Sequence, residues 1–143
     1  MSEQEWAELE VESKYENLEV IGEFISKTMR GFGVKENKDI FDVQLSVDEA
    51  CTNIIEHAYT GIENGKIWIK CKISESKKEF TVKIIDTGKA FNPNSIQTPD
   101  TKAELEDRKA GGLGIFFMKQ KMQSIKYAFE EKQNIITMKK FLT

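Results

Sequence analysis

The feature that most constrains the fold is a long apolar stripe between Ile40 and Tyr59. Apolar residues recur there at helical spacing, over a face broad enough for a largely buried helix. Such a helix needs a surface to cover, since tertiary packing supplies most of a helix's stability. Gly61 follows and predicts the end of the helix. The apolar positions are Phe41, Leu45, Val47, Ala50, Ile54, Ile55 and Ala58.

Five segments predict the strands of that surface. The segment AELEVES (7–13) alternates apolar and acidic residues, which is the pattern of a strand with one buried face. KIWIKCKI (66–73) and EFTVKIID (79–86) are joined by a short polar connection and predict a hairpin. IKYAFEE (125–131) and NIITMKKF (134–141) predict a second hairpin.

Two further helices are expected. Apolar residues at three- and four-residue spacing predict a helix over 16–29, which the GFG sequence at 31–33 ends. A glycine cluster at 111–114 opens another helix over 115–122. Because hairpins favour antiparallel pairing, we expect an α+β fold, a two-layer sandwich with helices on one face of a mostly antiparallel, mixed sheet.

Length and charge limit the classes of function. The 143 residues suit one compact domain, and a net charge of −3 gives no general attraction to nucleic acid or to an anionic membrane. The acidic beginning MSEQEWAELE is unlike a signal peptide, so we expect a cytoplasmic protein. Cys51 and Cys71 lack metal-ligand spacing and have apolar neighbours, which favours small buried side chains over a disulfide.

The buried helix carries three polar residues at four-residue intervals, namely Glu49, Asn53 and His57. This spacing places them along one side of an α-helix. An asparagine oxygen can hold Mg²⁺, and a carboxylate one turn away can deprotonate a nucleophile. The alternatives are a solvated helix face for Glu49 and Asn53 and a structural role for His57.

Two glycine-containing segments complete the candidate site. Asp86 ends a hydrophobic strand and could accept a hydrogen bond from the amine of adenine, while Gly88 would let a flat base approach the backbone. The amides at the start of the helix after Gly111, Gly112 and Gly114 could bind phosphate. An ordinary turn and a flexible hinge are the respective alternatives. The intervening 92–110 has no clear periodicity and is expected to form a lid.

The three motifs together resemble the GHKL ATPase superfamily, and in particular the RsbW-like and SpoIIAB-like anti-sigma factor serine/threonine kinases. The asparagine box of these kinases is matched by Glu49, Ala50, Asn53, His57, Ala58 and Tyr59. The first glycine box is matched by Asp86, Gly88 and Phe91, and the second by Gly111, Gly112, Leu113, Gly114 and Ile115.

The resemblance implies a role for each matched position. Asn53 would bind Mg²⁺, and Glu49 would be the general base toward the attacking hydroxyl. Asp86 would accept a hydrogen bond from the adenine amine, Gly88 would border the base, and Phe91 would belong to the nucleotide site. Gly112 to Gly114 would hold the phosphates of ATP, and Gly111 and Ile115 would belong to the same site. Arg108 could reach the terminal phosphate or a partner, or be a solvated lid charge.

The function implied is that of an anti-sigma factor kinase, a single ATP-binding domain over 1–143. It would bind ATP and Mg²⁺, sequester a sigma factor and phosphorylate a STAS-type antagonist, usually as a homodimer. One alternative is a nucleotide-gated switch that binds a regulator without phosphorylating it. Another is a separate ATPase subunit of a two-component or phosphatase module.

Overall fold

A computed structural model describes residues 6–90 and 120–143 of the chain. The elements, in chain order, are β1 (Ala7–Glu12), a 3-10 turn (Tyr15–Asn17), α1 (Leu18–Gly31), α2 (Asn37–Asn53), a π-helical turn (Ile54–Ala58), β2 (Lys66–Ile73), β3 (Glu79–Asp86), β4 (Ser124–Glu130) and β5 (Gln133–Phe141).

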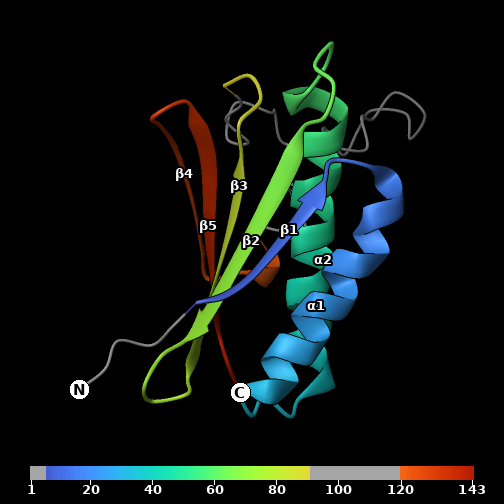
Figure 1. The fold of residues 1–143 in the computed structure, drawn as a ribbon. Coiled ribbons are helices and arrows are strands. Elements are labelled where there is room, and N and C mark those ends of the chain that lie inside the picture. Colours follow the sequence, from blue (N-terminus) through green and yellow to red (C-terminus); the bar gives the residue numbers. More distant parts are fainter. Residues whose placement is uncertain (1–5, 91–119) are drawn as a thin grey trace, which may run out of the picture.

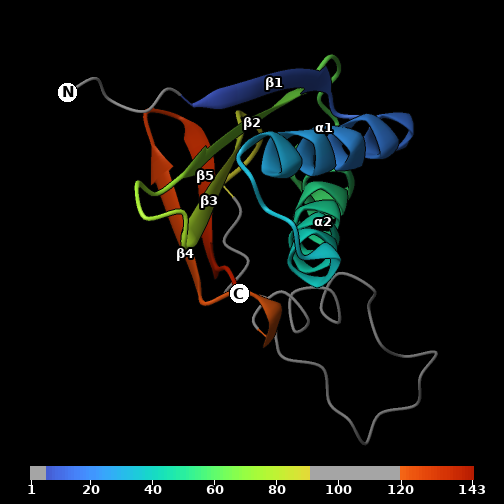
Figure 2. The ribbon, with the colours of Figure 1, turned by 90° about the horizontal axis from the view of Figure 1, so that it is seen from below.

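The five strands form one sheet in the order β1-β2-β3-β5-β4. Every pairing in that sheet is antiparallel. Helices α1 and α2 lie on one face of it, and among the described residues no helix covers the other face (Figures 1 and 2). The predicted α+β layer arrangement is therefore confirmed.

Strand β2 shows why the sheet has one buried face. Its residues alternate strictly, with Ile67, Ile69, Cys71 and Ile73 buried and the residues between them more exposed. Successive side chains on a strand point to opposite faces, so this alternation turns all four apolar side chains toward the helices. The predicted strand 66–73 is confirmed to the residue.

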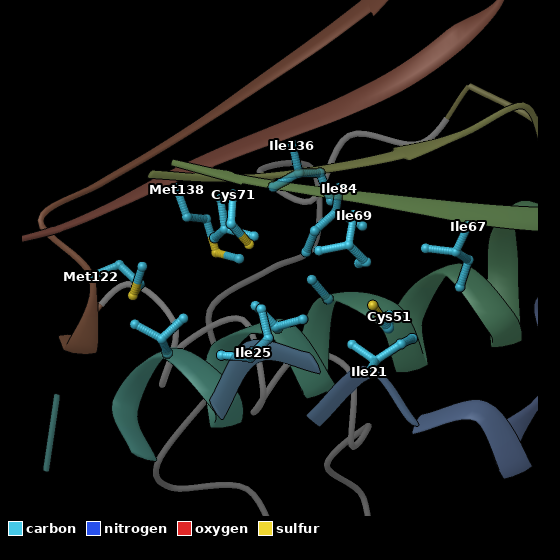
Figure 3. Close-up of a cluster of buried hydrophobic side chains, with 14 of the residues drawn as sticks. Ile21, Ile25, Cys51, Ile67, Ile69, Cys71, Ile84, Met122, Ile136 and Met138 are labelled. Atoms are coloured by element: carbon cyan, nitrogen blue, oxygen red, sulfur yellow. The ribbon is translucent and has the colours of Figure 1, made fainter. Parts of the chain in front are cut away.

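The core lies between this face and the two helices, as Figure 3 shows. Helix α1 contributes Ile21, Ile25 and Met29, which are at four-residue spacing and at most 1% exposed. Both cysteines lie in the same core as free thiols, which confirms the interpretation of Cys51 and Cys71 as small buried side chains.

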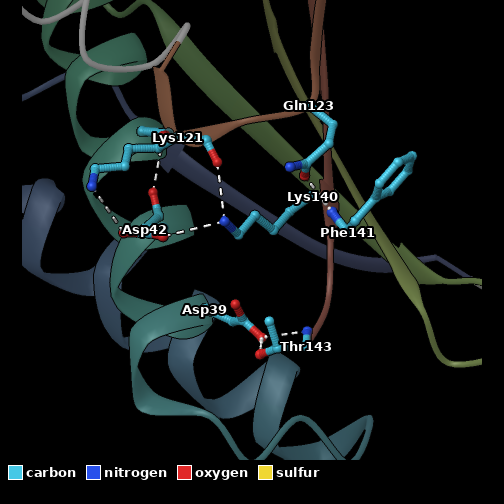
Figure 4. A network of polar contacts seen from close by, with 8 residues as sticks. Asp39, Asp42, Lys121, Gln123, Lys140, Phe141 and Thr143 are labelled. Carbon is cyan, nitrogen blue, oxygen red and sulfur yellow. Dashed lines mark hydrogen bonds and ion pairs between the residues drawn. The ribbon is translucent and has the colours of Figure 1, made fainter.

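Helix α2 begins at Asn37, three residues before the start that the apolar stripe predicts. The difference arises because its first turns bury Asp39 and Asp42, which a search for apolar spacing passes over. Asp42 accepts a hydrogen bond from Lys140 of β5 at 3.2 Å, and Asp39 accepts one from the backbone N–H of Thr143 at 3.0 Å. Figure 4 shows these contacts, which join the start of α2 to the end of the chain.

Two predicted elements lie wholly or mostly outside the described residues. The lid predicted at 92–110 lies outside the described residues, as does most of the helix predicted at 115–122, of which Gln120 and Lys121 are seen as helical. Within 6–90 and 120–143, no helix combines the length and the apolar character needed to cross a bilayer.

Candidate functional site

The candidate site begins on the last two turns of α2. Glu49 is half-buried there, and Asn53, four residues later, is 1% exposed. Both residues lie within regular α-helix, so the predicted i to i+4 relation places them on the same side of α2, one turn apart.

His57 departs from the predicted row. Residues Ile54–Ala58 form a π-helical turn, in which hydrogen bonds join residues five apart and the angular spacing of side chains changes. Asn53 is buried just before this turn, whereas His57 within it is exposed. The prediction of one α-helical row of three residues is therefore wrong for His57.

The carboxamide of Asn53 is buried without a hydrogen-bond partner. Within the structure described, neither its Nδ2 nor its Oδ1 has any partner. Leaving a buried polar group unsatisfied costs about 1–3 kcal/mol, and native proteins contain few such groups. The side chain is therefore better explained by a ligand that it would bind than by a contribution to the stability of the fold.

Glu49 has an environment suited to a base. Burial raises the pKa of its carboxyl above the ordinary value, and the negative charges of Asp48 and Glu56 raise that pKa further. A carboxylate with a raised pKa binds a proton more strongly than an ordinary glutamate, which is the property a general base needs.

Asp86 is the last residue of β3 and is 1% exposed. Its Oδ1 accepts a hydrogen bond from the backbone N–H of Gly88 at 2.9 Å and another from Nδ2 of Asn134 at 2.8 Å. Burial raises the pKa of the Asp86 carboxyl, while these two hydrogen bonds act in the opposite direction. No residue in 6–90 or 120–143 donates to Oδ2, so that oxygen can accept a hydrogen bond from a ligand.

The turn after β3 packs directly on the π turn that follows Asn53. The backbone N–H of Lys89 donates to the carbonyl of Ala58 at 2.7 Å. A Cβ added at Gly88 would lie only 2.2 Å from the same carbonyl oxygen, so this close approach requires glycine. In Figure 1 the ends of α2 and β3 accordingly lie at the same end of the sheet. Asn53 and Asp86, which are separated in sequence, are thereby brought to the same region.

Tyr59 fixes the turn from the other side. Its hydroxyl donates to the carbonyl of Lys66 at 2.5 Å and accepts from the backbone N–H of Thr87 at 2.8 Å. A Cβ at Gly65 would lie 2.4 Å from the ring of Tyr59, so the ring packs closely against this backbone. These contacts explain why tyrosine follows the asparagine motif here.

Sequence reasoning missed two residues of this region. Asn134 of β5 and Tyr127 of β4 are joined by a hydrogen bond of 2.6 Å, from the Tyr127 hydroxyl to Oδ1 of Asn134. The available signal was an asparagine within a strand, where that residue is depleted unless its side chain has a particular partner. The hydrogen bond between Asn134 and Asp86 depends on the order of the strands in the sheet, which no local sequence pattern predicts here.

The remaining predicted site residues lie outside the described part of the chain. They are Phe91, Arg108, Gly111, Gly112, Leu113, Gly114 and Ile115. In the part that is described, no three histidine, cysteine or acidic residues are grouped so that they could hold a metal ion. Mg²⁺ usually keeps several water or phosphate ligands, so a single protein ligand such as Asn53 is compatible with it.

The comparison that decides the family is a match to the model of the histidine kinase-like ATPase domain, over residues 11–140. The chain belongs to this family of ATPase domains. The predicted resemblance to RsbW-like kinases is confirmed as well. Serine-protein kinase RsbW of Halalkalibacterium halodurans is 30% identical to this ATPase-family chain over 142 residues, covering 96% of the chain and 84% of that protein.

Two other relatives are similar over a shorter span. RsbW of Listeria monocytogenes is 32% identical over 104 residues, which is 70% of this chain and 65% of that protein. The serine/threonine-protein kinase BtrW of Bordetella bronchiseptica is 29% identical over 98 residues, 68% of each chain.

Solved structures share the fold of this ATPase domain. The RsbU and RsbW domains of Rv1364c from Mycobacterium tuberculosis match with a TM-score of 0.66 and 14% identity, over 95% of this chain and 32% of that one. A histidine kinase domain from Erythrobacter litoralis matches with a TM-score of 0.56 and 13% identity, over 85% of this chain and 61% of that one.

Proposed function

We propose that this protein is a serine/threonine protein kinase of the anti-sigma factor type that uses ATP and Mg²⁺. It would hold a sigma factor and phosphorylate a serine or threonine of a STAS-domain antagonist. The single observation that carries the proposal is the buried, unpartnered carboxamide of Asn53, one helical turn from the half-buried Glu49. Similarity to serine-protein kinases named RsbW supports it.

The donor set at Asn53 fits Mg²⁺ with a nucleotide. The carboxamide oxygen is a hard neutral ligand, and a single protein ligand is enough where phosphates and water complete the coordination. Because Nδ2 of Asn53 is also unpartnered, it can donate to a phosphate oxygen without breaking an existing bond. Mg²⁺, when bound, neutralises charge on the phosphates.

The adenine base and the phosphates of ATP would bind on opposite sides of Asn53. Oδ2 of Asp86 would accept a hydrogen bond from the exocyclic amine of adenine, and Gly88 would leave room for the flat base. Phe91, Arg108 and residues 111–115, the second glycine box, would contribute to the nucleotide site, with the amides of that box toward the phosphates, as the sequence motif predicts.

Glu49 would act on the protein substrate. The hydroxyl oxygen of the substrate forms a bond to the γ-phosphorus of ATP as the bond from that phosphorus to the β–γ bridging oxygen breaks. Glu49 takes the hydroxyl proton, and ADP leaves with the bridging oxygen. The raised pKa of Glu49 favours this proton transfer, which is typically worth about 10²- to 10⁴-fold in rate.

The test is transfer of label from γ-labelled ATP to a STAS-domain antagonist, compared between wild type, Glu49→Gln and Asp48→Asn. Asp48 is the matched control because it is an adjacent half-buried carboxyl whose pKa is also raised by burial. We expect Glu49→Gln to lower the transfer rate about 10²-fold or more while ATP affinity changes less than about threefold. Asp48→Asn should keep most of the activity, because it removes one of the charges that raise the pKa of Glu49 but leaves burial, which is the larger cause.

The outcomes separate the alternatives. Nucleotide-dependent binding of a partner with no transfer to any serine or threonine would favour the regulatory switch. Hydrolysis or transfer that needs a separate phosphatase or response-regulator component would favour the module subunit. Equal transfer by wild type and Glu49→Gln would remove Glu49 from the mechanism.

The proposal includes the assembly expected of this type of kinase, a homodimer in the cytoplasm. Sedimentation equilibrium with ATP or ADP measures the dimer directly. Capture of a purified sigma factor under the same two conditions measures the nucleotide dependence of that partner.

A further inference from the structure

We propose that Asn134 of β5, held by Tyr127 of β4, is a positioning residue that sets the preference of the nucleotide site for a 6-amino purine. The inference rests on the proposed function, since it requires a nucleotide base beside Asp86. It adds two residues that lie more than forty positions from Asp86 in sequence and outside all three sequence motifs.

Asn134 lies at the centre of a buried set of hydrogen bonds. Its side chain is 1% exposed, and its Nδ2 donates to Oδ1 of Asp86 at 2.8 Å and to the backbone carbonyl of Lys89 at 2.7 Å. Its Oδ1 accepts from the hydroxyl of Tyr127 at 2.6 Å. Among the described residues, the Asn134 amide therefore bonds at least three groups, which come from three separate segments of the chain.

The chemistry of these groups permits only one orientation of the amide. Asp86 and the Lys89 carbonyl are both acceptors, so they must face the NH₂ group, which has two hydrogens to donate. The Tyr127 hydroxyl is a donor to the opposite oxygen. Turning the amide by 180° would place Oδ1 against two acceptors, so Tyr127 and Lys89 together lock Asn134.

The locked amide in turn fixes the carboxylate of Asp86. Its Oδ1 is occupied by Asn134 and by the N–H of Gly88, so the plane and direction of the carboxylate are set. The carboxylate oxygen presented to a ligand can only accept. A purine with an amine at position 6 donates to it, whereas a purine with an oxygen there faces it with a second acceptor.

Asn134 also holds the turn that the base would approach. The carbonyl of Lys89 bonds Asn134, and the N–H of Lys89 bonds the carbonyl of Ala58, so residues 86–89 are tied to β5 at one point and to the π turn at another. The position of Asp86 relative to the nucleotide is thus determined by β5 as well as by its own strand.

The test compares the affinities for ATP and for inosine triphosphate, which carries an oxygen at position 6, by calorimetry with saturating Mg²⁺. Wild type should prefer ATP by about 10- to 100-fold, the range expected for a hydrogen bond to a charged group. Asn134→Leu, of similar volume and without polar atoms, should reduce that preference to less than about threefold. Tyr127→Phe should reduce it partly.

Tyr15→Phe is the matched control, because it also removes one tyrosine hydroxyl, one that donates to Glu56 at 2.9 Å in an exposed place. It should leave the ATP preference unchanged. A merely structural role for Asn134 would weaken both nucleotides equally and leave their ratio intact, which would overturn the inference. If Asn134→Leu does not fold, an unchanged ratio in Tyr127→Phe overturns it instead.

The same measurement distinguishes a failure of the proposed function from a failure of the role given to Asn134 and Tyr127. A wild type that binds neither nucleotide contradicts the proposed function. A wild type that prefers ATP, with the preference fully kept in both variants, contradicts only the role of Asn134 and Tyr127.

Discussion

The two ends of α2 are built in opposite ways. At its start, the buried Asp39 and Asp42 are paired with Thr143 and Lys140 of the C-terminal strand and its extension. At its end, the equally buried Asn53 has no partner among residues 6–90 and 120–143 for either polar atom of its side chain. Paired polar groups hold a fold together, whereas an unpaired one detracts from stability and is retained where a ligand needs it. The contrast predicts that the start of this helix serves the fold and that its end serves a ligand.

The largest expected loss of unfolding free energy is at the start of α2. Asp42→Ala leaves the ammonium of Lys140, whose side chain is 11% exposed, without its carboxylate. Removing one partner of a buried ion pair typically costs about 3–5 kcal/mol, so the free energy of unfolding in urea should fall by about that amount. The double variant Asp42→Leu with Lys140→Met should recover most of it. A loss below about 1 kcal/mol would mean that the network does not stabilise this end.

A smaller loss of stability is expected where the turn after β3 packs on the π turn that follows Asn53. Gly88→Ala places a methyl group 2.2 Å from the carbonyl oxygen of Ala58, so the turn must move away from the π turn. Such overpacking costs about 1–3 kcal/mol, and the displaced Asp86 should bind ATP about 10-fold or more weakly. Gly22→Ala is the control, because a Cβ there meets nothing within 4 Å. Unchanged ATP affinity in Gly88→Ala would break the link between this turn and the nucleotide.

The smallest effect on stability is expected for Asp86→Asn. Because burial raises the pKa of this carboxyl in the folded protein, its charged form is disfavoured by folding. That cost is present at neutral pH and disappears as the pH falls through the folded pKa and below the ordinary value near 4. The variant should therefore be at least as stable as wild type at pH 7, and lose any advantage at low pH.

The same variant should bind ATP much more weakly. Its carbonyl oxygen can replace Oδ1 toward Gly88 and Asn134, which leaves an NH₂ group where the adenine amine needs an acceptor. Thermal unfolding at several pH values and calorimetry with ATP measure the two effects separately. Asp86→Asn with wild-type ATP affinity would contradict the assignment of Asp86.

The sequence predicted the elements well, because apolar periodicity follows directly from burial on one face. β2 and β3 were predicted to the residue, and Gly33, with a φ of +96°, lies just after α1 where the glycine pattern predicted a stop. Asn53 and Asp86 could be grouped in advance only through the resemblance to the kinase family. Their elements do meet at one end of the sheet.

The features that could not be predicted from the sequence depend on contacts between distant segments. The start of α2 was misjudged because Asp39 and Asp42 are buried by the end of the chain, and burial of a charge leaves no apolar signal. The π turn that exposes His57 depends on one extra residue in a turn, for which spacing alone gives no sign. Asn134 meets Asp86 only because β5 pairs with β3.

Asn53→Ala tests most sharply whether Asn53 serves a ligand and not the fold, with Asn37→Ala at the opposite end of α2 as its control. Calorimetry with ATP and Mg²⁺ and unfolding without ligand are measured for both variants. We predict that Asn53→Ala binds the nucleotide about 10- to 100-fold more weakly, while its unfolding free energy stays within about 1 kcal/mol of wild type or rises. Asn37→Ala should bind as wild type does. An Asn53→Ala protein that binds ATP with full affinity, but unfolds several kcal/mol more easily, would show that Asn53 serves the fold and not a ligand.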